Sequence, residues 1–202
     1  DAVYPMMYYK EGLFYPFVDD WLKHSNGRII VPGLGAYQMI ELGWSCRDIL
    51  NQVDYTRKGD TYGQAYFRTD NVLSDTKGIL NELKEYYRYP AKLPPMTWLS
   101  DSIPEGPFDL RAEKNEEGVF ELSWQANIRE RMTYNVYRSE TDTLHTDRAE
   151  ELIAVGLHET VYHCLPEEND KAYYYYITTS DAYFNESSPC IPAFFFHSEM
   201  EK

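Results

Sequence analysis

Apolar residues in the first half of the chain alternate between strand-like runs and stretches with helical spacing. The opening run, residues 1–9 (DAVYPMMYY), is apolar and aromatic. The next stretch places apolar side chains at i, i+3, i+4, i+7 and i+8, which predicts an amphipathic helix with one apolar face. Those side chains are Phe14, Phe17, Val18, Trp21 and Leu22. Asn26 and Gly27 are typical of the end of such a helix.

Two further units of a strand and a helix follow. Residues 28–31 (RIIV) form a short β-branched run that suits a strand buried on both faces. The next helix is predicted to begin at Ser45, with a capping box to Asp48. The third unit has a strand-like run at residues 61–69 and a helix with one apolar face. Strands and helices in this order predict parallel strands joined by right-handed crossovers.

The pattern changes near Pro104. Residues 89–107 contain five prolines, which indicates a boundary and linker. Downstream, about seven short strand signals arrive at the spacing typical of a β-sandwich. The predicted strands cover residues 107–112, 119–124, 134–138, 151–155, 160–162, 172–179 and 193–196. The sequence therefore predicts an α/β domain at residues 1–100 and an all-β domain at residues 101–202.

The charge and the cysteine content of the chain argue against several classes of binding partner. The formal net charge is -14, with 33 acidic and 19 basic residues, which disfavours nucleic acid and anionic membrane surfaces. No apolar run is long enough to span a membrane. Cys46, Cys164 and Cys190 have no C-x-x-C spacing, which argues against a zinc site. Cys164 and Cys190 could pair, although buried free thiols are the interpretation we favour.

No cofactor is predicted from the motifs. The five histidines lack the spacing of metal ligands, so we expect no metal site. Gly33 and Gly35 form a G-x-G without a third glycine before a helix, and this does not support a dinucleotide site.

The second half resembles a fibronectin type III domain across residues 104–199. The residues that carry this resemblance are Pro107, Leu110, Leu122, Trp124, residues 134–138 (YNVYR), residues 173–178 (YYYYIT), Asp181, Asn185, Glu186 and Ser187. The resemblance implies that Trp124 lies in the core, and that one of tyrosines 173–176 fixes a connection through its hydroxyl. It implies no catalytic residue.

The first half is similar to the end of the barrels of glycosyl-hydrolase-like family ten, a group described as bacterial lipoproteins with a C-terminal sandwich. The motifs are residues 4–9 (YPMMYY), 32–37 (PGLGAY) and 63–68 (GQAYFR). The resemblance implies a partial (β/α)8 barrel, in which residues 1–100 are the last three βα units and the remaining strands lie upstream. It also implies a secreted, periplasmic or cell-surface location.

In such a barrel, binding groups lie where strands end and βα loops begin. Aromatic rings there can stack on the C–H face of a sugar, and polar side chains can bind its hydroxyls. The predicted substrate-binding residues are Tyr8, Tyr9, Tyr37, Trp44, Gln64 and Arg68. For Trp44, a role as a helix-packing anchor is an equally good hypothesis.

Glycoside hydrolysis usually requires two carboxylates. Glu11, Glu41 and Asp70 occupy suitable loop positions, although each is also typical of a solvated loop or helix cap, which is the interpretation we favour. If catalytic carboxylates exist, we expect at least one on the upstream strands.

We therefore predict that this chain is part of a glycoside hydrolase that acts on a polysaccharide. Within that enzyme, the chain would contribute substrate binding and not complete catalysis. One alternative is a carbohydrate-binding or adhesion module whose fibronectin-like domain carries the function. Another is a structural module that self-associates through the open edge of the barrel sheet.

Overall fold

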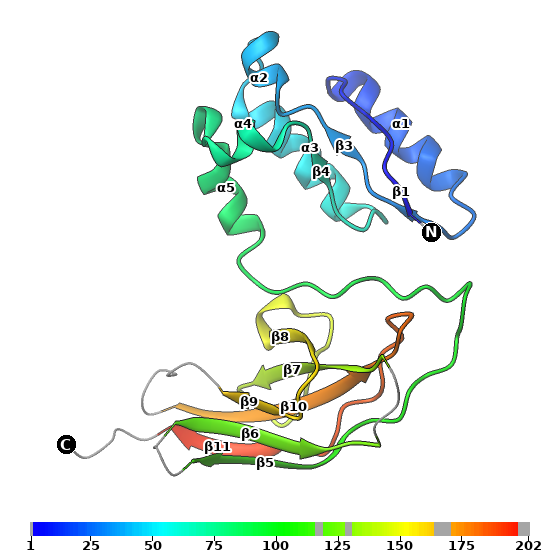
Figure 1. The fold of residues 1–202 in the computed structure, drawn as a ribbon. Coiled ribbons are helices and arrows are strands. Elements are labelled where there is room, and N and C mark those ends of the chain that lie inside the picture. The colour runs from blue at the N-terminus through cyan, green and yellow to red at the C-terminus, as the bar shows by residue number, and fades with distance from the viewer. Residues whose placement is uncertain (1, 116–118, 128–130, 164–170, 198–202) are drawn as a thin grey trace, which may run out of the picture. The chain divides into compact units, whose positions relative to one another are not determined.

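The structure is a computed structural model and describes residues 2–115, 119–127, 131–163 and 171–197. The chain divides into two compact units, Asp1–Arg88 and Tyr89–Lys202 (Figure 1). The proline-rich segment 89–107, predicted as a linker, therefore belongs to the second unit. The predicted identities of the two domains, with their boundary at residue 100, stay predictions.

The first unit contains a short parallel sheet. Strand β1 (Ala2–Val3) pairs with β2 (Ile29–Ile30), and β3 (Gly33–Leu34) pairs with β4 (Ala65–Tyr66). A parallel bridge between Met6 and Gly33 extends the first pairing, so β2 and β3 are two parts of one middle strand. The predicted order and parallel direction of the three strands are confirmed. These strands do not close a barrel, so the partial barrel stays a prediction.

Helices follow each strand of this sheet. They are α1 (Glu11–Lys23), α2 (Gln38–Glu41), α3 (Cys46–Lys58), α4 (Thr69–Leu73), the short 3-10 helix η1 (Thr76–Gly78) and α5 (Ile79–Tyr86). The predicted capping box is present at α3, because Ser45 and Asp48 each accept a hydrogen bond from the other's backbone N–H. This satisfies two of the unpaired donors at the start of the helix.

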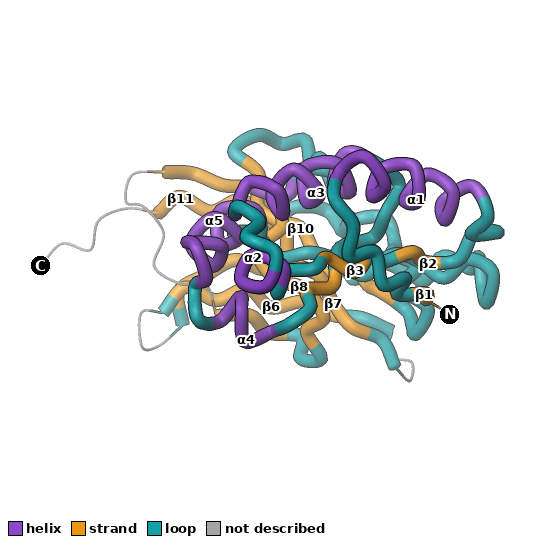
Figure 2. The backbone as a smooth tube through the Cα atoms, turned by 90° about the horizontal axis from the view of Figure 1, so that it is seen from above, coloured by secondary structure: helices purple, strands orange, loops and turns teal. Residues whose placement is uncertain are grey.

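The core of the first unit lies between the sheet and the longer helices. Its fully buried members include Met7, Phe14, Leu34, Ile49, Val53 and Ile79. Helices α1 and α3 lie side by side (Figure 2), and the rings of Tyr15 and Tyr55 stack between them with centroids 4.2 Å apart. This packing covers only one side of α1.

The predicted apolar face of α1 is present but only partly buried. Phe14 and Val18 are buried, but Phe17 and Trp21 are 42% and 41% exposed. The core of this unit covers the side of α1 that carries Phe14 and Val18 and leaves Phe17 and Trp21 at its margin.

The second unit is a β-sandwich, as predicted (Figure 1). Its strands are β5 (Phe108–Lys114), β6 (Phe120–Gln125), β7 (Thr133–Ser139), β8 (Leu152–Leu157), β9 (Val161–His163), β10 (Lys171–Ser180) and β11 (Ala193–His197), with the 3-10 helix η2 (Ala149–Glu151) before β8. One sheet has the order β5-β6-β9 and the other has the order β11-β10-β7-β8. Each predicted strand is present, with its ends shifted by a few residues.

Alternate side chains of the two sheets share one core. Leu122 and Trp124 from β6 meet Tyr134 and Val136 from β7 and Tyr175 from β10. Trp124 is buried, with its ring 5.4 Å from that of Tyr134, so its predicted core position is confirmed. The hydroxyl of Tyr175 hydrogen-bonds to Nε2 of His197 on β11 at 2.8 Å.

Cys46 and Cys190 are free thiols, and burial raises the pKa of both above the ordinary value. Cys164, the possible partner of Cys190, lies outside the described residues. In the part of the chain that the structure describes, no helix combines the length and apolar character that a membrane crossing requires.

Candidate functional site

Three aromatic rings converge where the three parallel strands end. Tyr8 follows the first strand, Tyr37 follows the second and Phe67 follows the third. The Tyr8 and Phe67 rings are stacked with centroids 5.5 Å apart, and the Tyr37 ring meets both edge-on at 5.7 and 5.5 Å. We name Tyr8, Tyr37 and Phe67 the aromatic corner. Carboxyl ends of parallel strands are where α/β folds usually place ligands.

Two glycines allow the Tyr8 ring to lie against the middle strand. A Cβ on Gly33 would lie 3.3 Å from Cε1 of Tyr8 and 3.0 Å from the carbonyl oxygen of Pro5. A Cβ on Gly35 would lie 3.2 Å from Cβ of Tyr8. The G-x-G of this strand is therefore a packing surface for Tyr8, because a side chain at either glycine would crowd this tyrosine.

Buried glutamines hold the backbone that carries the ring. Nε2 of Gln38 donates to the carbonyl of Tyr8 at 2.7 Å, and Nε2 of Gln52 donates to the carbonyl of Tyr9 at 2.8 Å. Gln38 is 5% exposed and Gln52 is fully buried. Because two successive carbonyls are fixed by groups from different helices, the position of Tyr8 is set by the fold.

An ion pair flanks the aromatic corner. The guanidinium of Arg68 lies 3.4 Å from Oε1 of Glu41 and 5.6 Å from the ring centroid of Phe67. Both charged side chains are more than half exposed, so the pair contributes little to stability. Its consequence is electrostatic, since Glu41 offsets the positive charge of Arg68 beside the rings.

The protonation state of Tyr8 suits hydrogen bonding to a neutral ligand. Burial, followed by the nearby Tyr37 hydroxyl, raises the pKa of the Tyr8 hydroxyl above its ordinary value of 10.0. A tyrosine hydroxyl is already protonated at neutral pH at its ordinary pKa, so this group can both donate and accept a hydrogen bond.

Only some of the predicted binding residues meet at this place. Tyr8, Tyr37 and Arg68 are brought together, whereas Tyr9 packs on Phe17 of α1 with ring centroids 5.3 Å apart. Trp44 is 4% exposed within the core, so its ring is a packing anchor with no open face for a sugar.

Gln64 is held elsewhere in the unit. Its Nε2 donates to Oγ1 of Thr56 at 2.7 Å, and its Oε1 accepts from the hydroxyl of Tyr87. Strand alternation explains this, since Gln64 and Tyr66 point toward the helices while Phe67 points to the other face. The binding role of Gln64 stays a prediction that these contacts do not favour.

The three candidate carboxylates have separate local environments. Glu11 accepts a hydrogen bond from Asn51 at 2.5 Å, which ties the start of α1 to α3. Glu41 forms the ion pair with Arg68. Asp70 lies in the first turn of α4, where its negative charge interacts favourably with the helix dipole. Their catalytic roles stay predictions. Among the described residues, no group of three or more His, Cys, Asp and Glu side chains could hold a metal ion.

Phe67 is the site residue that the sequence analysis missed. It lies in the strand-like run at residues 61–69, one position before Arg68. The alternation of that strand places Phe67 two residues from Ala65 on the face away from the helices, and this was the available signal.

Comparisons with known proteins find similar solved structures only. No family model matches the chain, and no curated protein matches it. A fibronectin-type-III-like protein from Clostridium thermocellum is 23% identical, covering 50% of this chain and 100% of that one, with a TM-score of 0.38. A beta-1,2-glucanase from Parabacteroides distasonis is 22% identical over 50% of this chain, with a TM-score of 0.37. A pectate lyase from Pectobacterium carotovorum is 20% identical over 40%, with a TM-score of 0.32.

The chain spans 14% of the glucanase and 25% of the pectate lyase. At these identities and TM-scores, none of the likenesses carries an argument about what this chain does.

Proposed function

We propose that the first unit binds a neutral carbohydrate at the aromatic corner. The observation that carries this proposal is the convergence of Tyr8, Tyr37 and Phe67 at the ends of three parallel strands. Phe67 is 46% exposed, so part of this aromatic cluster is accessible to a ligand. The hydroxyls of the two tyrosines supply donors and acceptors beside that surface.

A sugar matches both properties of this surface. One face of a pyranose ring carries C–H groups that pack on an aromatic ring, while its edge carries hydroxyls. A neutral sugar fits better than an acidic one, since Glu41 offsets the charge of Arg68 and the net charge of the chain is -14.

We assign this binding site to a larger carbohydrate-active protein. The resemblance to glycosyl-hydrolase-like family ten supports a glycoside hydrolase that is secreted, periplasmic or on the cell surface, with the sandwich as an accessory domain. On this proposal the chain alone does not hydrolyse a polysaccharide, and Glu11, Glu41 and Asp70 do not form a sufficient catalytic set. Release of reducing sugar by the purified chain, abolished by substitution of one of these carboxylates, would contradict that part.

The binding test compares two phenylalanines of similar exposure. Electrophoresis of the chain through gels that contain neutral or acidic polysaccharides gives a dissociation constant for each. We expect retardation by a neutral polysaccharide, and about tenfold weaker binding for Phe67→Ala, which corresponds to about 1.4 kcal/mol. Phe108→Ala is the matched control, because Phe108 is 42% exposed and lies on β5 in the second unit. Equal losses for the two variants would refute the aromatic corner as the site.

Self-association is a second candidate function, favoured by a separate observation. Leu13, Phe17 and Trp21 lie on successive turns of α1 and are 56%, 42% and 41% exposed. An apolar stripe of this kind commonly marks a protein–protein contact. Light scattering tests it, since a dimer that dissociates in Trp21→Ala supports the stripe, and a monomer at all concentrations rejects it.

A further inference from the structure

Residues 89–100 cross the sandwich as a strap and are fixed to it at several points. The backbone N–H of Met96 donates to the carbonyl of Tyr183 at 2.8 Å, and Nδ2 of Asn185 donates to the carbonyl of Ser100 at 3.0 Å. Nζ of Lys92 lies 2.6 Å from Oε2 of Glu186. We call residues 89–100 the strap. These contacts explain why a proline-rich segment belongs to the second unit.

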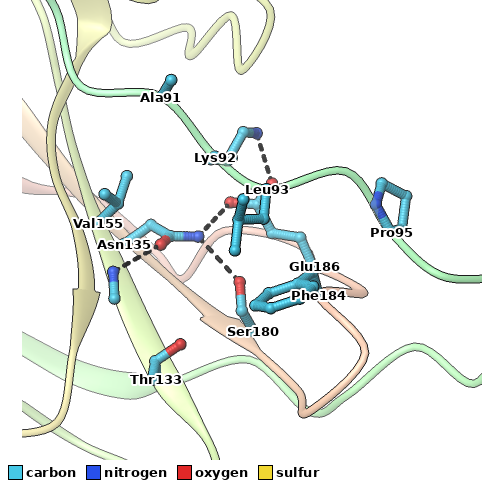
Figure 3. A pocket seen from close by; sticks show the side chains of 11 residues that line it. Ala91, Lys92, Leu93, Pro95, Thr133, Asn135, Val155, Ser180, Phe184 and Glu186 are labelled. Atoms are coloured by element: carbon cyan, nitrogen blue, oxygen red, sulfur yellow. Dashed lines mark hydrogen bonds and ion pairs between the residues drawn. The ribbon is translucent and has the colours of Figure 1, made fainter. Parts of the chain in front are cut away.

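Glu186 joins the strap to the sheet through its two oxygens. Oε1 accepts hydrogen bonds from three sandwich side chains: Tyr137 at 2.6 Å, Thr178 at 2.6 Å and Asn135 at 3.0 Å. Oε2 accepts from Lys92 of the strap (Figure 3). One carboxylate oxygen of Glu186 is therefore bound by side chains of the sandwich, and the other is bound by Lys92 of the strap.

The environment of this ion pair makes it stronger than a surface pair. The Glu186 side chain is 20% exposed and the Lys92 side chain is 30% exposed. Nζ of Lys92 also lies 5.4 Å from the ring centroid of Tyr137. A mostly buried carboxylate needs a positive partner, because leaving it unpaired costs several kcal/mol.

The strap forms one wall of a cavity of about 290 Å³. Figure 3 shows Ala91, Leu93 and Pro95 of the strap across from Val155 and Phe184 of the sandwich. Displacing the strap would remove this wall and expose the sheet face beneath it.

We propose that Lys92 and Glu186 form a latch that holds the strap against the sandwich along this cavity, and that breaking the latch releases the strap while the sandwich stays folded. The latch is a conformational device, distinct from the carbohydrate site proposed in the first unit. Opening removes the strap wall of the cavity and frees residues 89–100 from the sandwich.

Glu186→Gln tests the latch selectively. The amide oxygen of glutamine can keep the hydrogen bonds from Tyr137, Thr178 and Asn135, but its NH₂ group then faces the ammonium of Lys92. Hydrogen exchange of the full chain should show strap amides, including that of Met96, exchanging at least about tenfold faster. Core amides such as that of Ile177 should be unchanged.

Trypsin gives a second readout, because Glu186→Gln retains the cleavage site after Lys92. We expect cleavage after Lys92 to become at least about tenfold faster than in the unmodified chain. Glu113→Gln is the charge-matched control, since Glu113 is exposed on β5, and it should change neither measurement.

Lys92→Met is a second variant, for the case that Glu186→Gln fails to fold. It removes the positive partner of the same ion pair, on the strap. Faster exchange of strap amides with a protected sandwich core supports the latch. Unchanged strap protection in Lys92→Met, or loss of core and strap protection together, overturns it.

Discussion

Replacing Gly33 with alanine should destabilise the first unit and displace the Tyr8 ring. The added Cβ would lie 3.0 Å from the carbonyl oxygen of Pro5, which is backbone of the neighbouring strand, and 3.3 Å from Cε1 of Tyr8. Weak C–H···O contacts have carbon–oxygen distances of about 3.3–3.6 Å, so the strand or the ring must move by a few tenths of an ångström. The glycine backbone conformation itself is open to alanine, so the effect comes from packing.

The expected magnitude follows from two opposing terms. Overpacking at a close contact costs about 1–3 kcal/mol, and replacing glycine with alanine recovers about 0.4–1 kcal/mol by restricting the unfolded chain. We expect a net loss of about 1–2 kcal/mol in the free energy of unfolding. Gly12→Ala is the control, because no atom lies within 4 Å of the added Cβ. Within α1, that change should stabilise by about 0.5–1 kcal/mol.

The assay must report on the first unit alone. Pulsed hydrogen exchange of peptides from residues 46–58, which form α3, across a series of urea concentrations gives the unfolding midpoint of this unit. The midpoint should fall for Gly33→Ala and rise for Gly12→Ala. Equal shifts in the same direction would refute the argument that Tyr8 and Pro5 need the absent Cβ. Neutral polysaccharide should also bind more weakly to Gly33→Ala, since the ring moves.

Three further predictions concern the sandwich. Leu122→Ala removes a fully buried side chain and should cost about 2–5 kcal/mol, seen as a lower thermal midpoint of the second unit. Gly106→Ala would place a Cβ 2.9 Å from the carbonyl oxygen of Ser188 and should cost about 1–3 kcal/mol; an unchanged midpoint would contradict it. Burial raises the pKa of Glu186, but hydrogen bonds from Lys92 and three sandwich side chains outweigh it and hold the pKa below the ordinary 4.5. The unfolded chain therefore binds the proton more tightly, so this stabilisation is complete above pH 4.5 and is lost as pH falls through the lower folded-state value. The urea midpoint of Glu186→Gln should depend less on acid than that of the unmodified chain.

Local patterns were sufficient for the order of the elements. Alternation in residues 119–124 predicts β6, because the two faces of a strand in a sandwich differ in polarity. Ser45 and Asp48 predict the start of α3, because capping depends on groups three residues apart. These signals need no information about distant parts of the chain.

Local patterns failed where a residue's environment is made by distant segments. The stripe on α1 could not show that Phe17 and Trp21 stay exposed, because that depends on which neighbours cover the helix. The sequence predicts sugar stacking and helix packing equally well for Trp44, and only the burial of its ring distinguishes the two roles.

The sequence by itself therefore determined the strand and helix order, the parallel and sandwich halves, and the candidate aromatic and polar residues. Tertiary structure alone decided that the rings of Tyr8, Tyr37 and Phe67 meet, with Tyr8 against Gly33, and that Glu186 pairs with Lys92. The physical reason is sequence separation. Backbone preferences and caps act within a few residues, whereas these contacts join segments about thirty to ninety residues apart that only the packed fold brings together.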